Sequence, residues 1–388
     1  MTDSYATDGS SEMFAQVRAV NKRRKALFVQ TQAENAGAQE IARQLALGAE
    51  RQGWDTRQVF FFRRTASFDN DASAIFCARE RPSTPIGVVR LLFELYRLIR
   101  EESPDVVVSF QHYGNVIAAP IARLLGVQLV IANQMSETAL VPSPVCLVDW
   151  IIGQMGFYDR IVVNSSTIEE TYRSYPAAYR RRLKRIDHGF ADKSSSLDKS
   201  SARLALGLPL DVELLGCAAR LNPLKQLDLA IRLLPVDKNQ HFAVAGQGTD
   251  IERLEAIAVE LGVRERVHFL GEIDSRMMGV FLSSLDCFVF PSATESFGLA
   301  PVEAAQAGVP VVANDLQVLR EVLAVDGEPC ALFVDAHEAA AFAAAVRRVL
   351  DDSKLREALT ARGRRLRERY PLERMIDEFL VLMELRSP

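Results

Sequence analysis

Short apolar runs alternate with amphipathic stretches along the chain from Lys25 onward. In the first half the apolar runs predict strands at 25–30, 55–62, 105–110, 127–132 and 160–164. Apolar residues at helical spacing predict helices over 37–52, 86–102, 115–125, 145–157 and 166–175. The rhythm restarts in the second half, with strands predicted at 213–219, 240–245, 266–270, 286–290, 309–313 and 330–334. Strands this apolar, separated by helices, indicate parallel sheets covered on both faces.

The two halves are separated by the sequence ADKSSSLDKSSA at 191–202, which is rich in Ser and Lys and poor in core residues. We therefore predict an α/β protein of two doubly wound, Rossmann-like domains, 22–190 and 191–371, whose parallel sheets face a cleft between them. Such sheets bind ligands at the carboxyl ends of their strands. The polar residues 1–21 are expected to form a disordered tail, and the amphipathic segment 372–388 is compatible with packing back on the first domain.

Length and charge narrow the class of protein. The 388 residues exceed the roughly 250–300 at which a single core stops growing, and a content of 48% hydrophobic and 25% charged residues excludes a disordered chain. The net charge of −4 argues against a nucleic-acid partner, because such domains are usually basic. Residues 1–190 carry 23 Lys and Arg against 20 Asp and Glu, whereas residues 191–388 carry 23 against 30. The first half is thus the one that would meet an anionic surface.

The predicted helix 86–102 has a broad apolar face with Arg90, Arg97 and Arg100 elsewhere on it. Together with the basic residues of 22–25 and 180–185, it is compatible with peripheral contact with an anionic membrane, and equally with a core helix beside solvated charges. The five cysteines form no CxxC pair, which argues against a disulfide framework or a thiolate zinc site. No signal-peptide pattern and no run of about 18 uninterrupted apolar residues occurs. We expect a cytoplasmic protein, with any membrane contact on the inner face.

The most informative stretch is PSATESFGLAPVEAAQAGVPVVA at 291–313, between two predicted strands. Pro301 suits the first turn of a helix and Gly308 its exit, so residues 296–300 present backbone N–H groups as an anion site. Glu295 lies just before this helix and Glu303 in its first turn, and a carboxylate suits a vicinal diol such as a ribose. Taken alone, the two carboxylates are equally compatible with a helix-dipole partner and a solvated side chain.

Two further loops follow predicted strands. In CAARLNPLKQLDLAI at 217–231, Arg220 and Lys225 are two cations that can straddle a diphosphate, although basic residues in such loops are usually only solvated. The strand at 240–245 leads into Gly246-x-Gly248. A dinucleotide fingerprint would need a third glycine where Ile251 stands, which disfavours a plain NAD site.

In order and spacing, these features resemble the nucleotide-sugar domain of the GT-B glycosyltransferases, specifically the large retaining group called family 4. Glu295 and Glu303 match its E-x7-E motif, with Ser296, Phe297, Gly298 and Leu299 between them. Arg220 and Lys225 match its Arg/Lys pair, although Gln226 stands where glycine is common, and Gly246 and Gly248 match its glycine pair.

The amino-terminal half resembles the family more loosely. Of the usual glycine-rich loop after the first strand only Gly37 remains, in Glu34-Asn35-Ala36-Gly37-Ala38. His112, in SFQHYGN at 109–115, stands where members often carry a sugar-contacting histidine, although a lone histidine beside a strand end is often a packing residue. Residues 133–135 and 164–165 would line the acceptor side of the cleft, and His188-Gly189 resembles the Asn-Gly before the hinge.

The resemblance implies a hexosyltransferase that moves a sugar from a UDP- or GDP-linked donor to a hydroxyl of a glycan or glycolipid, with retention, in cell-envelope or polysaccharide biosynthesis. Arg220, Lys225 and the amides of 297–299 would stabilise the leaving diphosphate, Glu303 would hold the ribose and Glu295 the sugar. His112 would contact the sugar or the incoming hydroxyl.

No resident cofactor or metal is expected. Asp69-Asn70-Asp71 is formally a DxD, the motif that other glycosyltransferases use for a divalent ion, but it does not lie at a clear strand end. Two other classes stay open: a sugar phosphorylase or nucleotide-sugar 2-epimerase on the same architecture, and a catalytically silent binding partner.

Overall fold

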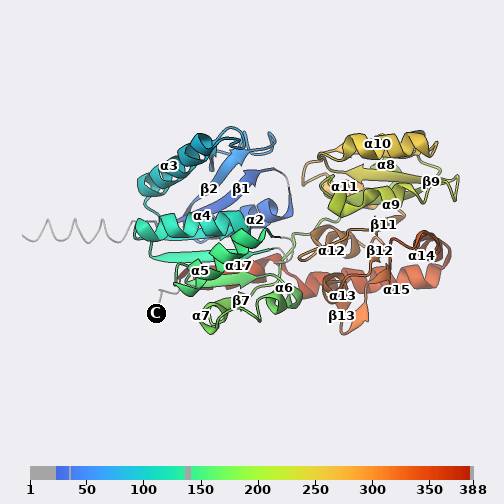
Figure 1. The fold of residues 1–388 in the computed structure, drawn as a ribbon. Coiled ribbons are helices and arrows are strands. Elements are labelled where there is room, and N and C mark those ends of the chain that lie inside the picture. The colour runs from blue at the N-terminus through green and yellow to red at the C-terminus, as the bar shows by residue number, and fades with distance from the viewer. Residues whose placement is uncertain (1–22, 35, 136–140, 385–388) are drawn as a thin grey trace, which may run out of the picture.

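The computed structural model describes residues 23–34, 36–135 and 141–384, which form two domains, each built on one parallel sheet (Figure 1). The tail predicted at 1–21 lies outside the described residues. The first sheet has seven strands in the order β3-β2-β1-β4-β5-β6-β7 and the second has six in the order β10-β9-β8-β11-β12-β15. All neighbouring pairs in both sheets are parallel. The prediction of two doubly wound α/β domains is therefore confirmed.

The amino-terminal domain alternates strands and helices along the chain. Its elements are β1 (Lys25–Ala33), α2 (Gly37–Arg51), β2 (Asp55–Arg63), β3 (Ala74–Ala78), α3 (Pro85–Glu102), β4 (Val106–Phe110), α4 (Gln111–Leu124), β5 (Leu129–Gln134), α5 (Ser143–Gln154), β6 (Arg160–Val163), α6 (Ser166–Thr171), α7 (Ala177–Arg180) and β7 (Leu183–Arg185).

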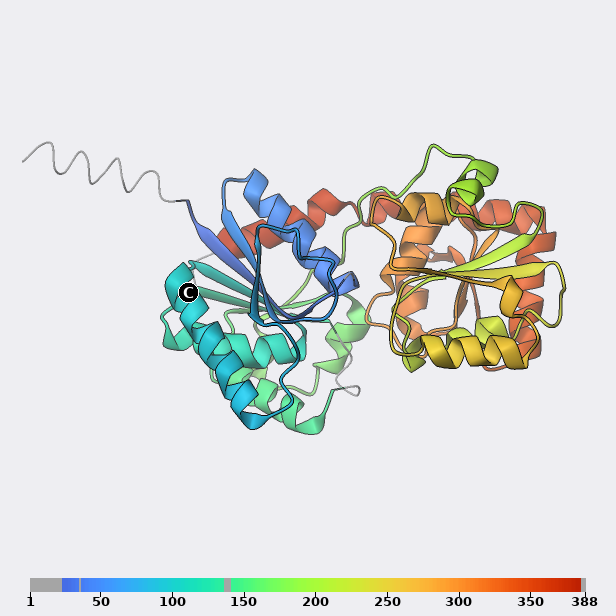
Figure 2. The ribbon, with the colours of Figure 1, turned by 90° about the horizontal axis from the view of Figure 1, so that it is seen from above.

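The central strands of this domain are buried on both faces. Along β1, Leu27 and Val29 belong to the core under α3, α4 and α5, whereas Ala26 and Phe28 belong to the core under α2 and α17 (Leu372–Glu384). Figure 2 shows these two helix layers on opposite sides of the sheet. The alternation explains why the strand reads as a continuous apolar run rather than an alternating one.

The carboxyl-terminal domain repeats the design with helices on both faces of its sheet (Figure 2). Its strands and short helical turns are β8 (Glu213–Ala218), η2 (Pro223–Lys225), β9 (Gln240–Ala245), η3 (Arg264–Arg266), β10 (Val267–Gly271), β11 (Cys287–Phe290), β12 (Val311–Asn314), β13 (Ala324–Val325), β14 (Glu328–Pro329) and β15 (Ala331–Val334). Its helices are α8 (Lys199–Ala205), α9 (Leu227–Ile231), α10 (Ile251–Glu260), α11 (Met278–Ser283), α12 (Leu299–Gln306), α13 (Gln317–Val322), α14 (Ala339–Asp351), α15 (Ser353–Arg364) and α16 (Leu366–Arg369).

The chain crosses between the domains twice, at neighbouring points. Phe190 forms an isolated parallel bridge with Pro371, and its N–H donates to the carbonyl of Tyr370 at 3.1 Å. After this crossing α17 lies against α2 of the amino-terminal domain, where Gly48 has no side chain and leaves room for Ile376. Figure 1 shows α17, in red, among the blue and green elements of that domain.

Three local predictions need correction. The helix predicted over 115–125 begins at Gln111, because the chain turns directly from β4 through a positive φ of 64° at that residue. The segment 191–202 is not all linker, since Asp198 caps α8 by accepting from the N–H of Ser201. The edge strands β3 and β7 were not predicted: β7 (LKR) has no apolar run, whereas the apolar sequence of β3 (AIFCA) was overlooked. No helix among the described residues is long and apolar enough to span a membrane.

Candidate active site

The strand order of each sheet changes direction at one point, and these two points face each other. In the first sheet β1 and β4 are neighbours, and in the second β8 and β11 are neighbours, with the next strands running outward on each side. Open parallel sheets bind ligands at the carboxyl ends of such strands. Beyond these ends lie Glu34, Arg220 and Glu295 in loops, and His112 in the first turn of α4.

Contacts across the cleft show how closely the two sets of strand ends approach. The hydroxyl of Ser165 donates to the carbonyl oxygen of Ser296 at 3.0 Å. A Cβ built on Gly37, at the start of α2, would lie 2.5 Å from a methyl carbon of Leu299, at the start of α12. A larger residue at position 37 would therefore require the end of the Leu299 side chain to shift.

The predicted cations of the carboxyl-terminal domain are both paired with carboxylates. The ammonium of Lys225 lies 2.5 Å from a carboxylate oxygen of Glu295 and 5.5 Å from the ring centre of Phe290. Arg220 forms an ion pair with Glu34 of the other domain. A diphosphate that enters the cleft must therefore compete with a carboxylate for each cation.

The backbone between Glu295 and α12 has the form expected of an anion site. Gly298 has a φ of 87° and occupies the cap position of α12, a conformation that costs other residues energy. Phe297 is buried against the rings of His188, Phe190 and Tyr370, at centroid distances of 5.0, 5.9 and 5.3 Å. Phe297 thus anchors the loop to the hinge and leaves the helix N–H groups to face the cleft.

Glu303 lies on the second turn of α12, where burial raises its carboxyl pKa to about 7. The positive charge of Lys193 opposes this rise and the negative charge of Glu40 adds to it. Near neutral pH this carboxyl is therefore partly protonated, and only its ionised form has both oxygens free to accept hydrogen bonds.

Gly246 and Gly248 have a role that their spacing alone does not show. A Cβ on Gly246 would lie 2.0 Å from the carbonyl oxygen of Ala219, and one on Gly248 would lie 2.0 Å from that of Leu221. The N–H groups of Ala219 and Leu221 donate to the carbonyls of Ala245 and Gln247, each at 3.0 Å. The two glycines let the loop after β9 run alongside the loop that carries Arg220.

His112 lies in the first turn of α4 and is buried. Its Nε2 is 3.3 Å from the hydroxyl of Tyr172, and desolvation lowers its pKa to about 4. The imidazole is therefore neutral at physiological pH. The positive φ of Gln111, which L residues adopt at a cost, fixes the direction in which this first turn leaves β4.

Other residues expected on the acceptor side are structural. Asn133 donates to the carbonyl of Ser109 at 3.1 Å, and Gln134 donates to Asp149 at 2.8 Å, both in the interior. Asn164 lies 3.0 Å from Nε2 of His188, whose pKa is lowered to about 3 by complete burial. These side chains shape the strand ends rather than line the cleft.

The Asp69-Asn70-Asp71 segment is engaged locally. Asp69 pairs with Arg63, and Asp71 accepts from the N–H and the hydroxyl of Ser73 at 2.8 and 2.7 Å. Among the residues that the structure describes, no cluster of three or more His, Cys, Asp or Glu side chains is arranged to hold a metal ion.

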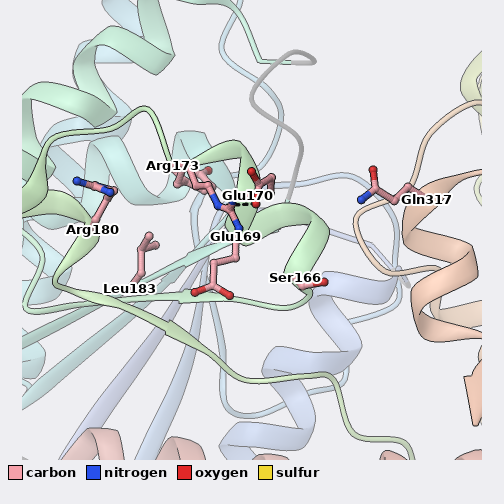
Figure 3. A pocket seen from close by; sticks show the side chains of 8 residues that line it. Ser166, Glu169, Glu170, Arg173, Arg180, Leu183 and Gln317 are labelled. Carbon is pink, nitrogen blue, oxygen red and sulfur yellow. Dashed lines mark ion pairs between the residues drawn. The ribbon is translucent and has the colours of Figure 1, made fainter. Parts of the chain in front are cut away.

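A cavity of about 490 Å³ lies at the domain boundary, beside α6 and α7 and across from α13 (Figure 3). Its lining is mostly polar and charged: Ser166, Glu169, Glu170, Tyr172, Arg173, Arg180, Leu183 and Gln317. Tyr172 is the side chain whose hydroxyl contacts His112, so this cavity adjoins the amino-terminal side of the cleft. It contains none of the site residues predicted from the sequence, but it includes Arg180 of the basic segment 180–185.

Two features of the site escaped the sequence. Glu34 is buried just after β1, and the sequence indicated it only as the first residue of the loop 34–38, with no role of its own. Glu321 of α13 accepts from the N–H groups of Ser166 and Thr167 at 2.7 and 3.0 Å, and so caps α6 of the other domain. Both contacts join segments far apart in the chain.

Comparison with known proteins finds that one family model matches part of the chain. Residues 198–366 match the family model described as glycosyl transferases group 1. The chain is 32% identical over 236 residues to a D-inositol 3-phosphate glycosyltransferase of Geodermatophilus obscurus, covering 57% of this chain and 51% of the relative. It is 33% identical over 190 residues to the lipopolysaccharide core biosynthesis mannosyltransferase LpsB of Rhizobium meliloti, covering 46% and 53%. The chain thus spans about half the length of the curated relatives it matches.

The whole fold resembles that of solved structures. HepE of Anabaena, solved with UDP and glucose, superposes with a TM-score of 0.80 at 17% identity, covering 94% of this chain and all of that one. The predicted GT-B architecture is therefore confirmed.

Proposed function

We propose that the chain is a group 1 glycosyltransferase, the family whose model matches residues 198–366, and that it moves a hexose from a nucleoside diphosphate-sugar to a hydroxyl of a glycan or glycolipid. The observation that carries this proposal is that Arg220 and Lys225 follow β8 and that α12 follows the neighbouring strand β11, so all three lie beyond the carboxyl ends of adjacent strands. Because HepE, which has the same fold, was solved in complex with UDP and glucose, UDP-linked sugars are the first donors to test.

The cations would act on the leaving group. As the bond between the anomeric carbon and the diphosphate breaks, negative charge grows on the diphosphate oxygens. Arg220, Lys225 and the N–H groups at the start of α12 are fixed before the reaction, so they stabilise that charge without reorganisation. This set of groups supplies the positive charge that a divalent ion provides in other transferases, and we propose that transfer is independent of metal.

Donor binding would also free Glu295. In the structure this carboxylate pairs with Lys225. Once a phosphate takes the ammonium, Glu295 can accept hydrogen bonds from hydroxyls of the transferred sugar, while Glu303 accepts them from the ribose diol. His112, neutral at physiological pH, can accept or donate a single hydrogen bond to the sugar or the acceptor.

We propose that transfer retains the configuration of the anomeric carbon. The acceptor oxygen would attack from the face that the diphosphate leaves, forming the new carbon–oxygen bond as the old one breaks. The departing phosphate oxygen would take the acceptor proton, so no covalent sugar–enzyme intermediate forms. The anomeric proton coupling of the product, followed by NMR from the first turnovers, separates retention from inversion.

A second surface favours an acceptor at a membrane. Helix α5 turns Asp149 inward, where Gln134, Tyr158 and Tyr179 each donate to its carboxylate at 2.8 Å. Its outward face is apolar and exposed: Leu147, Val148, Trp150 and Ile151, followed by Met155. Helix α7 packs against α5, and the exposed side chains nearby are mostly basic: Arg173, Arg180, Arg181, Lys184 and Arg185.

Apolar side chains with a tryptophan, beside cations, suit the surface of an anionic bilayer. We propose that α5 and the basic segment place the protein on such a membrane. Vesicles of phosphatidylglycerol should sediment the protein at low salt, and the Ile151→Glu variant should bind at least several-fold less. Val259→Glu, on an exposed apolar residue of α10, is the matched control and should leave binding unchanged. Equal binding of both variants contradicts the membrane contact.

Donor binding is the direct test of the proposed activity. UDP, GDP, ADP and their sugars are compared by thermal shift, with and without EDTA. A ligand at 100 times its Kd stabilises a protein by ~2.7 kcal/mol, so one base should raise the midpoint clearly, undiminished by EDTA. Lys225→Ala should remove most of that shift. A protein that responds to none of these nucleotides is not a transferase of this kind.

A further inference from the structure

One ion pair in the cleft joins the two domains through the residue expected to bind the donor. Arg220 follows β8 of the carboxyl-terminal domain, and its Nη2 contacts Oε1 of Glu34, which follows β1 of the amino-terminal domain. The two residues are 186 positions apart in the chain. The pair therefore links the positions of the two sheets directly at the point where the leaving group would lie.

Glu34 is held on its own domain as well. Its second oxygen, Oε2, lies 3.5 Å from Nε of Arg64, just beyond the end of β2. The amide of Gln32 donates to Oε1, and the side-chain oxygen of Gln32 accepts from Arg64 at 3.3 Å. The carboxylate is 5% exposed, whereas the guanidinium of Arg64 is more accessible. Two guanidinium groups thus share one buried carboxylate.

The ion pair with Glu34 leaves one hydrogen-bond donor of Arg220 without a partner in the described part of the chain. Its Nε is buried and has no hydrogen-bond partner among the described residues, while its side chain as a whole is 31% exposed. An unpartnered N–H of a charged group is costly in a buried position. The guanidinium therefore gains hydrogen bonds when an anion with several oxygens replaces the single carboxylate.

We propose that Glu34 acts as a latch on Arg220. Before the donor binds, the carboxylate of Glu34 pairs with Arg220. The diphosphate of the donor then displaces this carboxylate, which stays paired with Arg64. This rests on the proposed function, since it assigns a diphosphate to Arg220. The exchange leaves no charge unpaired, because Arg64 already contacts the second oxygen. Glu34 is thus a positioning residue that tunes donor affinity and ties it to the approach of the two domains.

Two opposite effects on donor affinity follow. Glu34→Gln removes the competing charge while keeping size and polarity, so UDP should bind about tenfold more tightly, which corresponds to ~1.4 kcal/mol. Arg64→Gln removes the second partner, so opening the latch would leave a buried carboxylate unpaired. UDP should then bind roughly tenfold more weakly.

The double variant separates the latch from direct donor contacts. If Arg64 acts only through Glu34, Arg64→Gln has no effect on the Kd of UDP once Glu34 is already Gln, as a double-mutant cycle detects. Glu272→Gln is the charge-matched control: Glu272 also bridges the domains, accepting from Ser67 at 2.6 Å, but no hydrogen bond or ion pair joins it to Arg220. Its Kd should stay within twofold of wild type.

The measurement is isothermal titration with UDP, with GDP run alongside, on the full chain and the four variants. Two results together support the latch: Glu34→Gln binds UDP more tightly than wild type, and adding Arg64→Gln to Glu34→Gln does not change the Kd of UDP. Binding that is unchanged or weaker in Glu34→Gln overturns the latch while leaving the proposed function standing. If neither wild type nor Glu34→Gln binds either nucleotide, the proposed function fails and the latch fails with it. Unliganded thermal midpoints verify that each variant folds.

Discussion

The contact between the loops after β8 and β9 makes Gly248→Ala an informative substitution. The new methyl group would lie 2.0 Å from the carbonyl oxygen of Leu221 and 2.7 Å from its carbon, both main-chain atoms that cannot rotate away. The loops must separate by more than an ångström, which strains the 3.0 Å hydrogen bond from Leu221 to Gln247. Overpacking of this kind costs about 1–3 kcal/mol, or roughly 2–10 °C in midpoint for a domain of this size.

The larger consequence concerns function, because the displaced loop carries Arg220. A shift of about 1 Å in a positioned group can cost about a hundredfold in rate. We therefore expect kcat/KM to fall by one to two orders of magnitude while the protein stays folded. Gly262→Ala is the control: its φ of 66° makes alanine cost roughly 1–2 kcal/mol, yet no atom within 4 Å meets the new methyl. If both variants lose stability but Gly248→Ala keeps wild-type kcat/KM, the two glycines do not position Arg220.

Three further outcomes follow from the geometry. Burial raises the carboxyl pKa of Glu303 to about 7, and the proposed contact with the ribose needs the ionised form. UDP-glucose or GDP-mannose should therefore bind roughly tenfold more weakly at pH 6 than at pH 8. In Glu303→Gln, titration calorimetry should show a Kd that does not change with pH. Burial lowers the pKa of His188 to about 3, so as the pH falls the unfolded chain takes up a proton before the folded protein does. The free energy of unfolding should therefore fall by ~1.4 kcal/mol per pH unit below about pH 6.5. Urea unfolding at pH 7 and pH 5 should show a smaller loss of stability for His188→Gln. Gln226 has a φ of 49°, so Gln226→Gly should raise the midpoint by up to a few degrees, corresponding to about 1 kcal/mol, whereas Gln226→Ala should not.

Much of the fold was readable from the chain because its central strands are buried on both faces. Strands such as β1 and β4 gave long apolar runs, whereas β7 (LKR) gave none, since an edge strand with exposed positions needs no apolar pattern. The positive φ at Gln226 also gives a physical reason for the glycine common at this point in the family that the sequence resembles.

The contacts across the cleft were beyond prediction from one sequence. Pattern reasoning placed Arg220, Lys225 and Glu295 on strand ends, but the pairing of Arg220 with Glu34 depends on how two domains meet. Gly246 and Gly248 were likewise matched only to the glycine pair of the family that the sequence resembles, whereas the structure shows their close approach to a neighbouring loop. Helix α5 reverses the usual pattern of a surface helix, because its charged residue, Asp149, points inward while its exposed face is apolar.

The position of α17 has a consequence for how the protein is made. The side chains of Ile376, Phe379 and Leu380 complete the core under α2, so the domain that is synthesised first is covered by a helix that is synthesised after both sheets. Until residues 372–384 leave the ribosome, that face of the first domain stays exposed to solvent, whereas the second domain already has its own core. Domains usually mature in the order of synthesis. Here we expect the first domain to complete its core only when α17 docks, after the second domain has been synthesised.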